Sequence, residues 1–242
     1  MLKFLKNIVR GQVRNYGLLE DIRKKTDEIN WSIIFNSAIT DSSWFKIKSL
    51  YPGRWAAGYP LLYILFRVYN DIKPKKILEF GLGETSKLSY QYHEAFSESE
   101  LIIIEQDQNW LNFFSTNIHN VISNTILLDI EYKNIGGFET KTYEGLIQKV
   151  SGKKFDFILV DGPWGSEHFS RYQIVEIVEN GNLADEFVII IDDYERKGEQ
   201  ETVAKLKDIF KIKNISFVEE TYHGIKSTLL ICSENYKFLT SL

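Results

Sequence analysis

The chain of 242 residues lacks cysteine almost entirely and holds only Cys232. One cysteine excludes an internal disulfide and a zinc site built on several thiolates, and it fits a reducing compartment. Long hydrophobic runs are also missing, because no apolar stretch reaches the roughly 18 residues that span a bilayer. The N-terminus shows no long apolar core of the kind found in secretory signals. We therefore expect a cytoplasmic protein without a signal peptide.

A large charge of one sign is lacking as well, since the formal net charge is −4. This balance provides no electrostatic attraction to nucleic acid, and we expect no nucleic-acid partner. The basic residues gather at one end, where residues 1–25 carry seven Lys or Arg against two acidic residues. Apolar spacing in residues 1–30 predicts amphipathic helices. Such a basic helix fits either peripheral contact with a membrane surface or packing on its own domain or on a second subunit of a homo-oligomer.

The distribution of aromatic, aliphatic, Pro and Gly residues divides the sequence into two regions. Residues 1–70 are predicted to form a helical, aromatic-rich N-terminal extension, and residues 71–242 an α/β domain. Ten aromatic residues lie between positions 31 and 70, and we expect most of them to build a core. Pro and Gly residues predict a loop over residues 51–60, followed by a helix over residues 61–69.

From residue 75 onward, short aliphatic runs alternate with segments of helix length. Five uninterrupted apolar runs are typical of a parallel sheet that is covered on both faces. The last two runs are joined by a short Gly-containing connection, residues 220–226, which predicts an antiparallel hairpin. We therefore expect a doubly wound, mostly parallel seven-stranded sheet with a terminal antiparallel hairpin. The predicted strands are 76–80, 101–105, 125–128, 155–160, 187–191, 215–219 and 227–232.

Acidic residues lie at the carboxyl end of each of the first five predicted strands. They are Glu79, Glu105, Asp129, Asp161 and the pair Asp192 and Asp193. Because ligands of open α/β sheets bind at the carboxyl ends of the strands, these acids mark the predicted site.

The first of these turns carries Gly81 and Gly83 between a strand and a helix that starts near Ser86. Glycines there let the backbone approach a ligand, although this pattern also occurs in dinucleotide-binding turns. Glu79 suits a cationic amino group, and the lack of a following Lys-Ser/Thr pair argues against a phosphate loop. Glu105 fits the two hydroxyls of a ribose, a device shared by NAD and S-adenosylmethionine sites. Asp129 fits an adenine amino group or is a solvated turn residue.

Four segments together resemble the class I S-adenosylmethionine-dependent methyltransferase superfamily. They are residues 77–83, 103–105, 160–163 and 191–193, and the similarity extends over roughly residues 55–235. The resemblance implies S-adenosylmethionine as cofactor. It implies the cofactor-binding residues Glu79, Gly81, Gly83, Ser86, Glu105, Asp129 and Asp161. Ser86 stands where a third Gly or Ala is often found in the superfamily.

Two narrower resemblances remain open. The segment 79–83, Glu105 with nearby Trp110, and residues 160–163 are similar to glucuronoxylan 4-O-methyltransferases, which implies a sugar hydroxyl as acceptor. Asp161 with Asp192 and Asp193 resembles instead the metal site of catechol-type O-methyltransferases, which implies a divalent cation such as Mg²⁺ or Ca²⁺. Three converging carboxylates would repel one another unless a cation or a proton joined them.

Methyl transfer to a hydroxyl needs a group that takes its proton. Asp161 is the first candidate, followed by Asp192, Asp193 and His223 in the hairpin connection. Candidate contacts to a small-molecule or saccharide acceptor are Trp164, Arg171, His168, Trp55 and Tyr59, each of which also fits ordinary packing. Two other functions compete, an NAD(P)-dependent oxidoreductase and a non-catalytic binding domain. Glu79 and the terminal hairpin argue against the first, and the full set of strand-end acids argues against the second.

Overall fold

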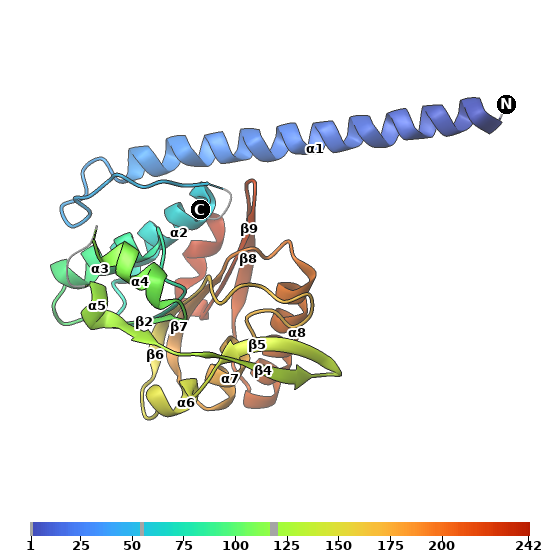
Figure 1. Ribbon diagram of the computed structural model, residues 1–242. Helices are drawn as coiled ribbons and strands as arrows, with labels where there is room; N and C mark the ends of the chain where they lie inside the picture. The colour runs from blue at the N-terminus through green and yellow to red at the C-terminus, as the bar shows by residue number, and fades with distance from the viewer. Residues whose placement is uncertain (1, 54–55, 117–120) are drawn as a thin grey trace.

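The computed structural model describes residues 2–53, 56–116 and 121–242. Its centre is a seven-stranded sheet in the order β3-β2-β1-β6-β7-β9-β8 (Figure 1). These strands are β1 (Lys76–Phe80), β2 (Glu100–Glu105), β3 (Thr125–Leu127), β6 (Phe155–Val160), β7 (Leu183–Ile191), β8 (Val218–His223) and β9 (Ser227–Cys232). Strands β3, β2, β1, β6 and β7 are parallel to one another, whereas β9 is antiparallel to both β7 and β8. The predicted doubly wound sheet with a terminal antiparallel hairpin is confirmed.

The predicted bounds were wrong for β8. This strand begins at Val218 and ends at His223, whereas the apolar run suggested residues 215–219. Ile215 and Phe217 instead pack against the core beside α8 (Lys197–Lys213). The strand itself carries Glu219 and Glu220 because it forms the edge of the sheet, where charged side chains reach solvent.

A second, two-stranded sheet was missed by the sequence prediction. It pairs β4 (Ile130–Ile135) with β5 (Phe138–Tyr143) in antiparallel fashion. The turn between them is Gly136-Gly137, with φ of +61° and +92°. Glycine adopts such angles without strain and favours a tight hairpin. The two strands carry many polar residues, so a search for apolar runs does not find them.

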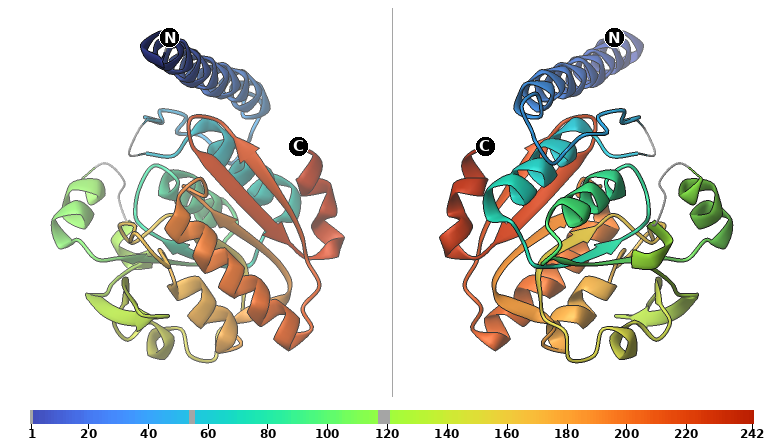
Figure 2. Two further views of the ribbon diagram at one scale, coloured as in Figure 1. Left: turned by 90° about the vertical axis from the view of Figure 1, so that its right-hand side faces the viewer. Right: turned by 90° about the vertical axis from the view of Figure 1, so that its left-hand side faces the viewer.

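Helices cover both faces of the main sheet (Figure 2). One face packs against α2 (Tyr59–Arg67), α3 (Ser86–Ala95) and α4 (Gln108–Ser115), and the other against α6 (Leu146–Lys149), α7 (Gln173–Glu179) and α8. Shorter elements are α5 (Val121–Asn124), a π-helical turn (Val68–Ile72) and a C-terminal 3₁₀ segment (Glu234–Ser241). Two apolar cores result, one on each face, and both hold the strand ends in fixed positions.

The aromatic-rich segment joins the core on the α2 side. Trp44 stacks on Phe66 with ring centroids 5.5 Å apart, and Tyr69 stacks on Tyr92 at 4.6 Å. All four rings are buried. These aromatic residues therefore build the core, as expected, while the predicted domain division at residue 70 stays a proposal.

Helix α1 (Leu2–Ala38) is one continuous helix, and its N-terminal part projects well beyond the rest of the protein (Figure 1). Its C-terminal part is held by Glu28, whose carboxylate accepts hydrogen bonds from the backbone N–H of Tyr59 at 2.6 Å and of Ile225 at 3.0 Å. Apolar side chains along the helix are exposed, namely Leu18, Leu19, Ile22, Ile29 and Ile33. Contact of this helix with a membrane surface or a second subunit stays a prediction. Among the described residues, no helix has both the length and the apolar character needed to cross a membrane.

Candidate active site

A cavity of about 570 Å³ opens at the carboxyl ends of the parallel strands. This size is typical of small-molecule sites, and so is the position in the sheet. The walls come from the loops after β1, β2, β6 and β7 and from the β8–β9 connection. Lining residues include Gly81, Gly83, Glu105, Gln106, Asp107, Trp110, Asp161, Trp164, Arg171, Asp193, Arg196 and Lys226. The predicted strand-end site is thus a physical cavity.

The loop after β1 depends on a glycine at position 81. Gly81 has φ of +92°, and its N–H donates to the carbonyl oxygen of Ile104 at 2.9 Å. A Cβ at this position would lie 2.6 Å from the carbonyl oxygen of Asp161. A Cβ on Gly83, in contrast, would meet no atom within 4 Å, and this glycine lines the cavity. The first glycine therefore permits the turn, and the second leaves room for a ligand.

Glu79 lies beneath this loop and is fully buried. Its Oε1 accepts hydrogen bonds from the hydroxyls of Thr85 at 2.7 Å and Ser86 at 2.8 Å, while Ser86 Oγ accepts the N–H of Gly83 at 3.0 Å. Burial raises the pKa of Glu79, against the lowering effect of neighbouring hydroxyls. Neither Glu79 nor Ser86 belongs to the described lining of the cavity. Both shape the glycine loop, and their direct contact with a cofactor stays a prediction.

Glu105 combines a structural contact with exposure to the cavity. Its carboxylate accepts the backbone N–H groups of Leu82 at 2.9 Å and of Gln106 and Asp107 at 2.8 Å each. Burial raises its pKa, and these three backbone hydrogen bonds act in the opposite direction. Because a carboxylate accepts more than three hydrogen bonds, Glu105 retains capacity for a ligand hydroxyl.

Trp110 forms the neighbouring wall. Asp107 caps the N-terminus of α4 by accepting the N–H of Asn109 at 2.8 Å and of Trp110 at 3.1 Å. The Trp110 indole N–H donates to the carbonyl oxygen of Leu82 at 2.6 Å. Asp129, predicted for an adenine amino group, is exposed and lies outside the lining, so the structure does not bring it to the cavity.

Three carboxylates meet at the opposite wall. Oxygen atoms of Asp161, Asp192 and Asp193 all lie within 4.8 Å of one another, an arrangement that the resemblance to catechol-type O-methyltransferases implied. Asp193 adopts φ of +57°. Such backbone conformations cost energy in non-glycine residues and gather at functional sites.

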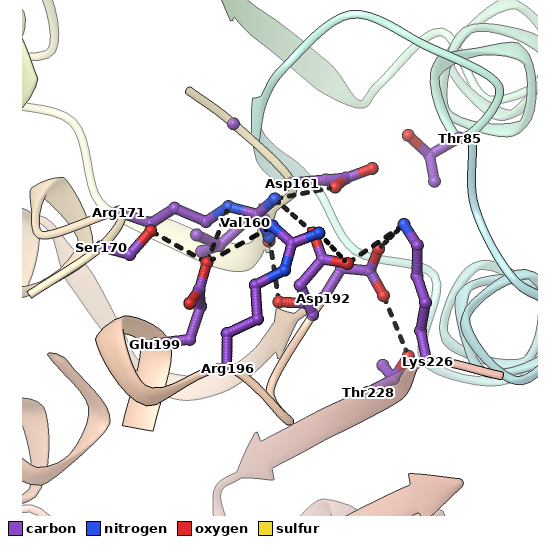
Figure 3. Close-up of polar contacts among 12 residues, drawn as sticks. Thr85, Val160, Asp161, Ser170, Arg171, Asp192, Arg196, Glu199, Lys226 and Thr228 are labelled. Carbon is purple, nitrogen blue, oxygen red and sulfur yellow. Dashed lines mark hydrogen bonds and ion pairs between the residues drawn. The ribbon is translucent and has the colours of Figure 1, made fainter. Parts of the chain in front are cut away.

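Three cationic side chains face this cluster (Figure 3). Arg171, only 5% exposed, contacts Asp161 at 3.4 Å and Asp193 at 2.8 Å through Nη2. Arg196 Nη2 lies 3.0 Å from Oδ1 of Asp193. The Nζ of Lys226 lies 3.0 Å from Oδ2 of Asp192 and 3.2 Å from Oδ1 of Asp193. The cluster is therefore a network of ion pairs rather than a set of unpaired acids.

The surroundings shift the pKa values of Asp161 and Asp193 in opposite directions. Burial and the charge of Asp192 raise the pKa of Asp161 to about 7, although Arg171 and Lys226 oppose this shift. Burial also acts to raise the pKa of Asp193, but Arg171, Lys226 and Arg196 outweigh it and hold that pKa below its usual value. Asp161 is thus the acid in this cluster whose proton exchanges near neutral pH.

This arrangement does not fit a divalent cation. Oxygen ligands hold Mg²⁺ or Ca²⁺ at roughly 2.0–2.6 Å, which requires the metal to lie between the carboxylates. The space between Asp192 and Asp193 is occupied by the Lys226 ammonium. The acids predicted as metal ligands are brought together, but cationic side chains already pair with them.

The structure places only some of the predicted acceptor-contact residues at the cavity. Trp164 is 63% exposed and lines the cavity. Arg171 lines it too, but its guanidinium is committed to the acid cluster. Trp55 lies outside the described residues. Tyr59 is outside the lining and packs on Phe35, with ring centroids 6.1 Å apart.

The two candidate histidines are also outside the described lining of the cavity. The Nδ1 of His168 lies 2.9 Å from Glu201, and the ring stacks on Phe138 at 3.8 Å. The Nδ1 of His223 lies 3.0 Å from the hydroxyl of Ser227. The structure therefore gives no contact between either histidine and the acid cluster, and their roles stay predictions.

Sequence analysis missed Lys226, Arg196 and Tyr51, all of which line the cavity. Arg196 stands three residues after Asp193 and immediately precedes α8, a proximity that the sequence already contains. Lys226 directly precedes β9, so the predicted hairpin placed it at the same edge of the sheet.

Comparison with known proteins gives a fold but no family. No family model matches the chain, and no curated protein matches it in sequence. Among solved structures, a putative caffeoyl-CoA O-methyltransferase from Staphylococcus aureus matches with a TM-score of 0.51 and 14% identity, over 85% of this chain and 100% of that one. A putative O-methyltransferase from Klebsiella pneumoniae matches with a TM-score of 0.51 and 16% identity, over 85% and 98%.

A third structure is the O-methyltransferase TomG from Streptomyces achromogenes, which is involved in tomaymycin synthesis and was crystallised with S-adenosylmethionine. It matches with a TM-score of 0.51 and 13% identity, over 87% of this chain and 97% of that one. The chain has the class I methyltransferase fold. Identities this low show the fold alone, and none of the three names contains a sugar acceptor, so the resemblance to sugar methyltransferases is not confirmed.

Proposed function

We propose that the protein is an S-adenosylmethionine-dependent O-methyltransferase. The observation that supports this most strongly is Glu105, whose carboxylate both fixes the glycine loop through Leu82 N–H and borders the cavity. An acid at the end of the second strand, opposite a glycine turn, is suited to the ribose hydroxyls of a nucleoside cofactor. In this proposal, the cofactor lies between Gly83 and Glu105, and its reactive end points to Asp161.

When bound, S-adenosylmethionine would supply the methyl group, and the electron pair of the broken C–S bond would stay on the sulfur of the departing S-adenosylhomocysteine. The protein has to orient the acceptor oxygen and remove its proton. Asp161 suits the second task, because a pKa of about 7 lets it accept a proton near neutral pH. Arg171, 3.4 Å from Asp161, orients this carboxylate and stabilises its charged form.

The proposed acceptor is a sugar hydroxyl of a surface polysaccharide or of its precursor, met in the cytoplasm. Support comes from Trp164, whose exposed ring at the cavity is suited to stack on a sugar face. The residues shared with glucuronoxylan-type methyltransferases favour the same acceptor class.

The test of this acceptor is transfer of a radiolabelled methyl group from S-adenosylmethionine to separate pools of nucleotide sugars, oligosaccharides and catechols. We expect labelled product in a saccharide pool with the wild type and none with Asp161→Asn. Label in the catechol pool alone would show that the acceptor is an aromatic alcohol and not a sugar, while the proposed methyl transfer would stand. No label in any pool, together with oxidation of an alcohol coupled to NAD(P), would favour the alternative function of an oxidoreductase.

A further inference from the structure

The Lys226 ammonium is built into the acid cluster at the ends of β6 and β7. Its Nζ donates a hydrogen bond to Oδ2 of Asp192 at 3.0 Å and lies 3.2 Å from Oδ1 of Asp193. The Lys226 side chain is only 12% exposed, and Asp192 is fully buried. Lys226 and Arg171 enter the cluster from opposite sides (Figure 3). This lysine is therefore a partner of both acids rather than a mobile surface charge.

The backbone of Lys226 is fixed by the hairpin that carries it. Its carbonyl oxygen accepts the N–H of Gly224 at 2.8 Å, and the N–H of the next residue, Ser227, donates to the carboxylate of Glu195 at 2.8 Å. From Ser227 onward, β9 pairs with both β7 and β8. A side chain on such a support holds its charge in one place, as a bound ion would.

The charges around the cluster point the same way. Asp161 pairs with Arg171, Asp192 with Lys226, and Asp193 with Arg171, Arg196 and Lys226. The buried Glu199 also lies 3.8 Å from Arg171 and 4.0 Å from Arg196, so four carboxylates face three cationic side chains, and each of the three aspartates already has a cationic partner. A divalent cation bound to the same carboxylate oxygens would add two positive charges beside the Lys226 ammonium, where repulsion in a poorly solvated site is strong.

We propose that the Lys226 ammonium takes the place of a divalent cation in this site, so that the protein binds its cofactor and works without a metal. The inference rests on the proposed function for the identity of the cofactor, but the exclusion of metal rests on the cluster alone. Lys226 acts as a positioning residue: it holds Asp192 and Asp193 in place and presents a fixed positive charge to the cavity that it lines. The ammonium has three N–H donors, so one remains beyond those facing the two acids.

Two measurements on the purified wild type test this without any substitution. Titration with MnCl₂, followed by the electron paramagnetic resonance signal of free Mn²⁺, should show no saturable site. Calorimetric titration with S-adenosylhomocysteine should give the same affinity in EDTA and in millimolar Mg²⁺. One equivalent of bound Mn²⁺ that Asp192→Asn removes would overturn the proposal, and so would cofactor binding that EDTA abolishes.

A variant tests the role of the ammonium itself. Lys226→Met keeps the length of the side chain and removes its charge, and we expect it to gain a Mn²⁺ site at least about tenfold tighter than any in the wild type, because changes around metal ligands alter affinity on this scale. Lys207→Met is the matched control, since Lys207 forms an ion pair with Glu219 away from the cavity. A Lys226→Met protein with wild-type circular dichroism that gains no Mn²⁺ would overturn the assignment of Lys226. Failure of the wild type to bind S-adenosylhomocysteine would instead contradict the proposed function, while the Mn²⁺ titration would still decide the metal question.

Discussion

Gly81 packs so closely against Asp161 that a Cβ on the glycine would lie 2.6 Å from the aspartate carbonyl oxygen. This contact joins the loop after β1, where the cofactor is proposed to bind, to the loop after β6, which carries the proposed base. Gly162 completes the contact from the other side, because its own Cβ would lie 2.8 Å from Gly81 Cα. The two loops therefore hold each other in place, and their separation depends on the absence of side chains.

Substitution of the two loop glycines should separate folding from binding. Gly81→Ala forces a residue with a Cβ into φ of +92° and into the Asp161 backbone, so we expect the free energy of unfolding to fall by at least about 1–3 kcal/mol. The Cβ added by Gly83→Ala would meet no atom within 4 Å, so this substitution should change the free energy of unfolding by about 0.5 kcal/mol or less. Chemical denaturation measures both values.

The same pair should behave differently toward ligand. Gly83 lines the cavity, so a methyl group there should weaken binding of S-adenosylhomocysteine in a protein of normal stability. Calorimetry on Gly83→Ala provides the measurement. Wild-type affinity in that variant would place the ligand away from the glycine loop.

Glu105→Gln should weaken cofactor binding. A hydrogen bond to a charged group contributes about 1.5–3 kcal/mol, so the affinity for S-adenosylhomocysteine should fall roughly ten- to a hundredfold. Part of the loss would arise from the loop, because Glu105 also accepts the Leu82 N–H. Thermal unfolding of the same variant measures that part, and the exposed Glu98→Gln is the control for removal of a carboxylate. Unchanged affinity would exclude Glu105 from the cofactor site.

The pH dependence should report Asp161. A base has to be ionised, so kcat/KM should rise with pH through a pKa near 7, and Asp161→Asn should lack turnover. Burial raises this pKa most, Asp192 and Asp193 raise it further, and Arg171 and Lys226 lower it. A wild-type profile that stays flat between pH 5 and 9 would remove Asp161 from the mechanism.

Stability should change with pH in the corresponding sense. The folded pKa of Asp161 lies above the unfolded value of 3.8, so unfolding releases a proton between these pH values and the folded state loses stability as pH rises from about 4 to 7. Asp161→Asn lacks this loss. The thermal midpoint of Asp161→Asn should therefore rise relative to that of the wild type between pH 5 and pH 8. A difference between the two midpoints that stays constant over this range would show that Asp161 does not titrate there.

Glu28 should anchor the long N-terminal helix. Its carboxylate accepts the N–H groups of Tyr59 and Ile225, so Glu28→Ala leaves two backbone donors without their partner and should cost about 1–3 kcal/mol of unfolding free energy. Asp27→Ala removes only an ion pair with the half-exposed Arg23 and should cost about 0–1 kcal/mol. Equal values for the two variants, measured by denaturation, would contradict this role.

Sequence patterns predicted the sheet because its buried strands are continuous apolar runs. The bounds of β1, β6 and β9 follow directly from such runs, because a strand that is buried on both faces is apolar along most of its length. The β4–β5 hairpin was missed, and the bounds of the edge strand β8 were misplaced, because the exposed faces of these strands carry polar residues. Their pairing depends on the turn and on neighbouring strands rather than on apolar periodicity.

The site was predictable to the extent that strand ends define it. Asp161, Asp192 and Asp193 follow adjacent strands and therefore meet. Lys226 was not predicted as their partner, because its position depends on the register that pairs His223 with Ser227 in the terminal hairpin. The role of Glu79 was not predictable in the same way. Its carboxylate is buried and accepts hydrogen bonds from Thr85 and Ser86, and sequence position alone does not specify the direction of its side chain.

The cavity between Gly83 and Glu105 is proposed to bind S-adenosylmethionine. Calorimetric titration of the purified protein with S-adenosylhomocysteine, beside a parallel titration with NADH, tests this binding most directly. We predict saturable one-to-one binding of S-adenosylhomocysteine, weakened in Glu105→Gln, and no binding of NADH. Binding of NADH, or no binding of S-adenosylhomocysteine by the folded protein, would contradict the proposed function.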